Sequence, residues 1–386
     1  MTDLLETARP RRSRGGSVAA VGRPGAKSVV VVGAGNIGSF LLGHLARQPA
    51  IRRLTIIDRD TYEAKNLWGQ DIGLREVGRP KASLQARRVR RINPALEVGA
   101  LVDAVENVPL GCLRADVILA CLDSRQARRY VNQAAWRLGV PWIDAGVDPD
   151  GLLARVNVYW PGPDAPDLEC GWSQADYDAL EQAYPCDQEA TSPAPTNAPS
   201  SLGALAAALQ AIECDKLLGG RAEEALIARQ VVLDARWQRH FVTALRRDPH
   251  CRFDHRTFDI EQLDFAPSEL SLGRVLALAP VVRTPHGEMT IRVEGHTFVT
   301  EVRCPRCGDS RQTFFRLSGR LRRSEEFCAT CRRGRIPSGR DSVEHLTSLL
   351  PKSQLVRSLH SFGFRRGDVF TLAAGEAESH FQIGGP

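Results

Sequence analysis

The segment SVVVVGAGNIG, residues 28–38, decides the fold of this chain. Its β-branched run predicts a buried strand, and its glycines predict a tight turn into a helix where backbone amides can approach a phosphate. A second apolar run at 54–57 ends on Asp58, whose carboxylate is placed to accept hydrogen bonds from a ribose. This βαβ opening therefore predicts a nucleotide-binding site.

The pattern that follows alternates strands with helices. This alternation predicts an α/β fold with a Rossmann-like, mainly parallel, doubly wound sheet, and the ligand is expected at the carboxyl ends of the strands. The predicted strands are 28–32, 54–57, 117–121, 141–145, 152–160, 229–234 and 240–243, and the predicted helices are 36–47, 80–92, 124–138 and 201–218.

Changes in composition and the positions of glycine and proline residues divide the chain into five predicted parts. A flexible basic N-terminus covers 1–26, and the sheet domain covers 27–255 with a crossing loop at 161–199. A linker or extension at 256–300 leads to a metal module at 301–340 and a small α/β extension at 341–386. With 386 residues, the chain can build one large core and a smaller module.

Composition also restricts the setting and the partners. The sequence has no apolar run of about 18 residues and no apolar signal core, so we expect a cytoplasmic protein that neither spans a membrane nor is secreted. The net charge is +6, and the basic clusters lack alternating aromatic residues. Nucleic-acid binding is therefore not expected.

Four motifs follow the second strand in a fixed order. They are DRD at 58–60, NLWGQ at 66–70, GRPKA at 78–82 and CLDS at 121–124. A hydride-transfer site does not require a lysine and a second acid at these places. Splitting ATP into AMP and pyrophosphate with a magnesium ion requires both. Lys81 can neutralise charge on the leaving pyrophosphate, and Asp123, just after a buried strand, can coordinate magnesium.

In this order and spacing, the motifs resemble the ubiquitin-activating superfamily, which includes the bacterial adenylyltransferases that activate sulfur carriers. The resemblance covers about 30–255. It implies an enzyme that uses ATP and magnesium to adenylate the C-terminal glycine of a ubiquitin-like or sulfur-carrier protein. Pyrophosphate is released, transfer to a thioester or thiocarboxylate can follow, and the enzyme forms a homodimer.

The resemblance also implies the site residues. Lys81 and Asp123 would be catalytic, with Asp123 also the magnesium ligand. The residues implied in nucleotide binding are Gly33, Gly35, Asn36, Gly38, Asp58, Asp60, Asn66, Gln70, Lys81 and Asp123.

Structural roles compete with four of these assignments. Asn66 and Gln70 could cap a turn, and Lys81 could be a solvated lysine at a helix start. Asp123 could be the N-cap of a helix beginning at Ser124.

One departure from the family pattern lies at Gly69, where relatives often carry an arginine. Arg79 or an N-terminal arginine from the partner of a dimer could replace it; Arg11, Arg12 and Arg14 are the candidates. A catalytically weak scaffold that recruits proteins through the metal module is the alternative function. A nicotinamide-dependent oxidoreductase ranks third.

The cysteines predict zinc. Cys304 and Cys307 form one Cys-x-x-Cys pair, and Cys328 and Cys331 form another, at the spacing of a zinc ribbon. Four thiolates close a tetrahedral zinc site, so this zinc would be structural.

A second zinc is suggested by the resemblance, with Cys170, Cys186, Cys251 and His255 as its ligands. Cys186 lies in the crossing loop, where some relatives keep a reactive cysteine. It is therefore the fourth ligand, a nucleophile that takes the carrier from the adenylate, or a loop cysteine with neither role. Cys112, Cys121 and Cys214 are expected in the core.

Overall fold

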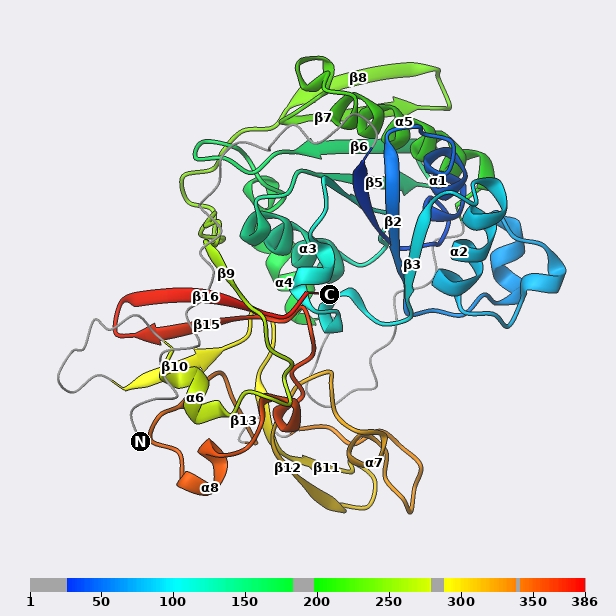
Figure 1. The fold of residues 1–386 in the computed structure, drawn as a ribbon. Helices are drawn as coiled ribbons and strands as arrows, with labels where there is room; N and C mark the ends of the chain where they lie inside the picture. The colour runs from blue at the N-terminus through cyan, green and yellow to red at the C-terminus, as the bar shows by residue number, and fades with distance from the viewer. Residues whose placement is uncertain (1–25, 183–197, 279–287, 338–340, 386) are drawn as a thin grey trace. The chain divides into compact units, whose positions relative to one another are not determined.

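The structure is a computed structural model that describes residues 26–182, 198–278, 288–337 and 341–385 (Figure 1). Within these residues the chain forms two compact units. The larger unit holds the residues up to Val108 and Leu113–Thr257, and the smaller one holds Pro109–Cys112 and the residues from Phe258 onward. No helix in the described ranges is long and apolar enough to span a membrane.

An eight-stranded sheet forms the centre of the larger unit, in the order β3-β2-β1-β4-β5-β6-β7-β8. Neighbours from β3 to β5 are parallel, and those from β5 to β8 are antiparallel. The predicted α/β class is confirmed, and the sheet is mixed. The strands are β1 (Lys27–Val32), β2 (Ile51–Ile57), β3 (Glu97–Leu101), β4 (Val117–Ala120), β5 (Trp142–Asp148), β6 (Leu153–Tyr159), β7 (Arg229–Asp234) and β8 (Arg239–Ala244).

The strand order reverses beside β1. The chain runs outward from β1 through β2 to β3 and then returns to place β4 on the other side of β1. In an open α/β sheet, a crevice forms outside the carboxyl ends of the two strands at such a reversal. The glycine turn lies at this point because it directly follows β1.

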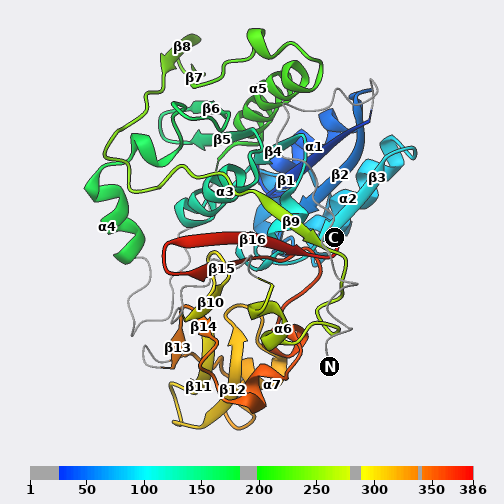
Figure 2. The same ribbon diagram turned by 60° about the vertical axis from the view of Figure 1, so that its left-hand side comes forward.

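One face of the sheet is covered by α1 (Gly38–Leu45), α2 (Lys81–Ile92) and α5 (Ser200–Leu218). Alternate strand residues such as Val29 and Val31 enter this core, since successive side chains in a strand point to opposite faces. Helix α3 (Arg125–Leu138) contacts the other face (Figures 1 and 2). Its Arg128 reaches Asp144 of β5, whereas Ile143 and Ala145, the residues on either side of Asp144, belong to the first core.

The smaller unit contains two antiparallel-rich sheets. The five-stranded sheet has the order β14-β10-β15-β16-β9, and the three-stranded sheet has the order β12-β11-β13. The five-stranded sheet therefore joins strands from the predicted segments 256–300 and 341–386. The strands are β9 (Ile260–Leu263), β10 (Met289–Arg292), β11 (Phe298–Arg303), β12 (Ser310–Leu317), β13 (Ser342–Val343), β14 (Leu346–Thr347), β15 (Val369–Ala374) and β16 (Ala377–Ile383).

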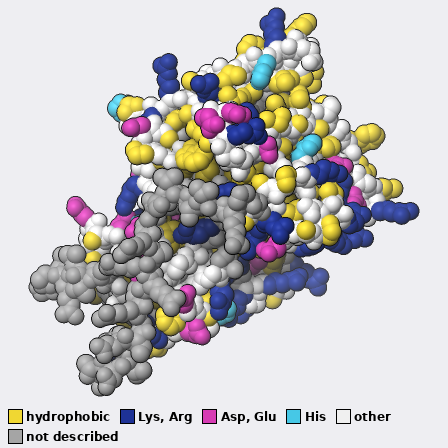
Figure 3. All heavy atoms as spheres, turned by 45° about the horizontal axis from the view of Figure 1, so that its top comes forward, with side chains coloured by type: hydrophobic (Ala, Val, Ile, Leu, Met, Phe, Trp, Pro, Cys, Tyr) yellow, Lys and Arg dark blue, Asp and Glu magenta, His cyan; other side chains and the backbone are white. Residues whose placement is uncertain are grey.

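Short helices complete both units. In the larger unit α4 (Gln174–Gln182) follows β6. The smaller unit has α6 (Leu272–Leu276), α7 (Arg323–Glu326) and α8 (Lys352–Leu355), and its core is rich in phenylalanine. Lys and Arg side chains on one face of the protein are interspersed with apolar and acidic ones (Figure 3).

Candidate functional site

The glycine turn after β1 is tightly enclosed. Gly33 has a φ of +95°, and a Cβ there would lie 2.3 Å from the carbonyl oxygen of Cys121. A Cβ on Gly38 would lie 2.0 Å from the Gly33 carbonyl oxygen. Because no side chain fits at either position, these glycines allow β1, the turn and β4 to approach one another closely.

Asp58 stabilises this turn from the end of β2. Its Oδ2 accepts a hydrogen bond from the Ala34 amide at 2.7 Å, and its Oδ1 accepts one from the Asp60 amide at 2.8 Å. Burial raises the pKa of Asp58, while the positive charge of Lys81 opposes that rise. The carboxylate therefore lies beside the turn, and its contact with a ribose remains a prediction.

Two residues that the sequence did not predict also stabilise the turn. The Tyr62 hydroxyl donates to the Ala34 carbonyl at 2.7 Å, and Gln85 Nε2 donates to the Tyr62 hydroxyl at 2.8 Å. Both contacts are buried. Their sequence signal is weak because a tyrosine and a helical glutamine have no motif spacing.

Lys81 begins α2 but is not solvated, since only 7% of its surface is exposed. The alternative of a solvated helix-start lysine is therefore wrong. Its Nζ lies 3.0 Å from Asp60 Oδ2 and 5.8 Å from the centroid of the Tyr62 ring. A buried ammonium that is held by one half-exposed carboxylate can transfer its interaction to a phosphate.

Asn36 joins the turn to the segment before α5. Its Nδ2 donates to the carbonyl oxygens of Gly69 and Ala198, and its Oδ1 is buried without a partner in the described part of the chain. A Cβ on Gly69 would lie 2.8 Å from the Ala198 carbonyl oxygen. A side chain at position 69 would therefore require the segment at Ala198 to shift.

The two other amides differ from each other. Asn66 Oδ1 accepts a hydrogen bond from the Glu63 amide at 2.8 Å and so caps the 3₁₀ helix Ala64–Trp68. Gln70 Nε2 is the atom nearest to a Cβ built on Gly35, at 3.8 Å, and Gln70 Oε1 is buried without a partner among the described residues. Asn66 therefore has the structural role that sequence reasoning held open, whereas Gln70 faces the glycine turn.

Asp123 lies at the carboxyl end of β4 and is exposed. The N-cap of α3 is Ser124, whose side chain accepts a hydrogen bond from the Ala127 amide at 3.4 Å. Asp123 is therefore not the N-cap, and that alternative is wrong. Within the described ranges it makes no hydrogen bond or ion pair, which leaves its carboxylate available to a ligand.

A buried charge cluster that the sequence did not reveal lies next to Asp123. Asp144 is fully buried, and its Oδ2 contacts Arg128 at 3.2 Å and Arg155 at 3.1 Å. Arg128 also donates to the carbonyl of Leu122, the residue before Asp123. The cluster therefore holds in place the backbone segment that carries Asp123.

The four cysteines of the smaller unit come together. Cys304 and Cys307 lie in the turn between β11 and β12, and their sulfurs lie within 4.8 Å of those of Cys328 and Cys331. Two sulfur ligands of one tetrahedral zinc lie about 3.8 Å apart. The Cys307–Cys328 sulfur distance is 3.6 Å, so the thiols fit a zinc ion. Zinc and the ribbon topology remain predictions.

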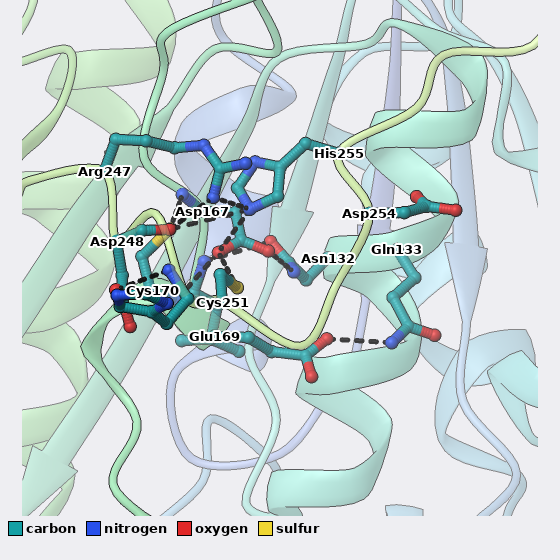
Figure 4. Close-up of polar contacts among 12 residues, drawn as sticks. Asn132, Gln133, Asp167, Glu169, Cys170, Arg247, Asp248, Cys251, Asp254 and His255 are labelled. Carbon is teal, nitrogen blue, oxygen red and sulfur yellow. Dashed lines mark hydrogen bonds and ion pairs between the residues drawn. The ribbon is translucent and has the colours of Figure 1, made fainter.

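The second predicted cluster has a different fourth member. Cys170, Cys251 and His255 lie together with Asp167, and the four donor atoms are within 4.8 Å of one another (Figure 4). Cys186, the fourth ligand or nucleophile in the sequence prediction, lies outside the described residues, as do Arg11, Arg12 and Arg14.

None of the described cysteines outside the four-cysteine cluster has the lowered pKa of a reactive thiol. Burial raises the pKa of the Cys112 thiol to about 11 and that of Cys251 to about 12. Burial likewise raises the pKa values of Cys121, Cys170 and Cys214.

Fold and site together define a class of α/β proteins built around a glycine-rich turn at the reversal point of a mixed sheet. Within this class, the chain belongs to the ThiF family, whose model matches residues 22–253. The matched range includes the glycine turn, Lys81 and Asp123.

Curated relatives agree with this assignment. The chain is 30% identical over 153 residues to a ubiquitin-like modifier-activating enzyme 5 from Oryza sativa subsp. japonica, covering 36% of each chain. It is 34% identical over 142 residues to the adenylyltransferase and sulfurtransferase UBA4 of Yarrowia lipolytica, covering 36% of this chain and 35% of that one. The resemblance to the ubiquitin-activating superfamily is confirmed. The chain spans about a third of the length of both relatives.

A solved structure of E. coli MccB with ATP is a more distant match. It is 22% identical, with a TM-score of 0.48, and the match covers 59% of this chain and 66% of that chain.

Proposed function

We propose that this protein adenylates the C-terminal glycine of a ubiquitin-like or sulfur-carrier protein, with ATP and magnesium, and releases pyrophosphate. One observation carries the proposal. An enclosed glycine turn follows β1, the buried Lys81 at the start of α2 pairs with Asp60 just after β2, and Asp123 after β4 has no partner in the described part of the chain. Its relatives' names as activating enzymes support an enzyme of this kind.

Each group has a distinct part in the proposed reaction. Amides of the turn bind phosphate oxygens, and Asp58 accepts the ribose hydroxyls. An oxygen of the carrier carboxylate attacks the α-phosphorus, and the bond to the bridging oxygen of pyrophosphate breaks. Lys81 stabilises the charge that develops on the leaving group, since a fixed cation in a partly dry site acts strongly on it.

Asp123 is the proposed ligand for magnesium, which would neutralise phosphate charge when bound. An exposed carboxylate at a strand end suits a hard cation that retains several waters. Position 69 is a glycine, so the phosphates receive less positive charge than in relatives that carry an arginine there. We include the homodimer in the proposal because an arginine from a second copy could supply that charge.

Carrier-dependent exchange of labelled pyrophosphate into ATP tests the proposal. Asp123→Asn should lower the exchange rate by at least about 100-fold, comparable to the loss of one preorganised electrostatic group. Asp150→Asn, which changes an exposed acid on the turn after β5, should leave the rate unchanged. Equal rates in the two variants would refute the magnesium assignment.

The absence of an arginine at position 69 supports a second function, a scaffold with weak or absent catalysis. A scaffold would bind partner proteins but show no exchange with any carrier, in the wild type as in Asp123→Asn. Exchange by the wild type with even one carrier would exclude it.

A further inference from the structure

Asp167 belongs to a cluster of four possible metal ligands, and its position in the sequence did not predict this. It precedes the 3₁₀ helix Glu169–Gly171, so Asp167 and Cys170 share an i, i+3 spacing, while Cys251 and His255 share an i, i+4 spacing after β8. Figure 4 shows the side chains of both pairs converging on one point.

Distances within this cluster match the edges of a metal tetrahedron. The His255 Nε2 atom lies 3.6 Å from Cys170 Sγ and 3.5 Å from Asp167 Oδ1, and Cys251 Sγ lies 3.6 Å from the same Oδ1. For zinc, sulfur and nitrogen or oxygen ligands should lie about 3.5 Å apart. The donor set of two thiols, an imidazole and a carboxylate suits zinc as well.

The carboxylate of Asp167 is oriented for ligation. It is fully buried, and burial of an unpaired carboxylate is costly. Asn132 Nδ2 donates to Oδ2 at 2.8 Å, and the Cys170 amide donates to Oδ1 at 2.7 Å. These two bonds fix the carboxylate with Oδ1 toward the sulfurs, as outer hydrogen bonds usually do for a metal ligand.

We propose that Asp167 completes a zinc site with Cys170, Cys251 and His255, so that Cys186 is not a ligand. The inference is independent of the adenylation proposal. It replaces one member of the ligand set expected from the sequence and leaves Cys186 without a metal-binding role.

Arg247 supplies the charge balance. Two thiolates and a carboxylate around a divalent zinc leave one net negative charge, and the guanidinium Nη1 lies 3.7 Å from Cys170 Sγ. The same Nη1 lies 2.7 Å from His255 Nε2. Because Nε2 has a single lone pair, the guanidinium must give up this bond when zinc binds and keep its place beside the thiolates.

Zinc content of the purified full-length protein tests the ligand set. The wild type and Cys186→Ser should each hold about two zinc ions per chain, one in each cluster, because Cys186 ligates neither. Asp167→Asn should hold about one, and Asp167→Cys should restore the second, since a thiolate can replace the carboxylate. Asp164→Asn, an exposed acid in the same segment, is the matched control.

Two variants identify which cluster has lost its metal. Cys328→Ser should remove the zinc of the four-cysteine cluster while the second zinc remains. Combined with Asp167→Asn, it should bring the content close to zero. A chelator should empty the Asp167 cluster of the wild type first, because two thiolates hold zinc less strongly than four.

Three results would overturn the proposal. They are a wild type with zinc only in the four-cysteine cluster, an Asp167→Asn variant that keeps both ions, and a Cys186→Ser variant that loses one. The first would make the cluster a polar network held by Arg247 without metal.

Discussion

Replacing Gly33 and Gly35 separately with alanine should separate the contribution of the turn to folding stability from its contribution to nucleotide binding. A Cβ at Gly33 would meet the Cys121 carbonyl oxygen at 2.3 Å, in a backbone conformation with φ of +95°. At Gly35 the nearest atom to a new Cβ is Gln70 Nε2, at 3.8 Å, which is an ordinary contact. The two glycines belong to one turn, so each variant is the control for the other.

The expected loss of stability for Gly33→Ala has two parts. The left-handed backbone costs an L-residue about 1–2 kcal/mol, and forcing extra bulk into a packed region costs about 1–3 kcal/mol. Together they give about 2–5 kcal/mol, which corresponds to a decrease in Tm of roughly 5–20 °C for a unit of this size. Gly35→Ala should stay within about 0.5 kcal/mol of the wild type.

Thermal unfolding and titration calorimetry with magnesium ATP measure the two effects. Gly35→Ala should weaken ATP binding at least about tenfold, or about 1.4 kcal/mol, because its methyl group occupies the side of the turn that a phosphate must approach. Wild-type affinity in a folded Gly35→Ala variant would show that the nucleotide does not lie on this turn. Equal loss of stability in both variants would refute the steric argument.

Two other substitutions test the neighbouring groups. Lys81→Met should lower pyrophosphate exchange by at least about 100-fold, whereas Lys65→Met, at an exposed lysine paired with Glu63, should not; a loss of tenfold or less would remove Lys81 from the reaction. Asp144→Ala should lower the free energy of unfolding by about 2–4 kcal/mol, because Arg128 and Arg155 lose their shared buried partner but retain some access to water. Urea denaturation measures this loss, and a value below about 1 kcal/mol would mean that water replaces the carboxylate.

Local patterns predicted the elements that are buried and regular. The valine run of β1, the apolar end of β4 and the Ala-rich α5 each have a period that matches one kind of structure. Strand β3 was missed because Glu97–Leu101 lies at the edge of the sheet, half in solvent, and has no apolar run. Edge strands lack the double burial that makes central strands readable.

Contacts between distant residues were the harder part of the site. The sequence suggested Cys170, Cys251 and His255 as ligands, but Asp167 resembles any loop acid until the fold places it opposite His255. In the same way, nothing in the sequence pairs Asp144 with Arg128 and Arg155. Single-chain periodicity reports which side of an element is buried, and it does not report what lies opposite.

The strand order of the smaller unit has a consequence for synthesis of the chain on the ribosome. Strand β16 lies inside the five-stranded sheet and pairs on one side with β9, roughly 120 residues earlier, so a long loop must close before that pair forms. Until β16 emerges, β9 and β15 each keep an unpaired edge that a second nascent chain could occupy. Folding of this unit therefore cannot be completed before residue 383 has left the exit tunnel, and its vulnerable period lasts until then.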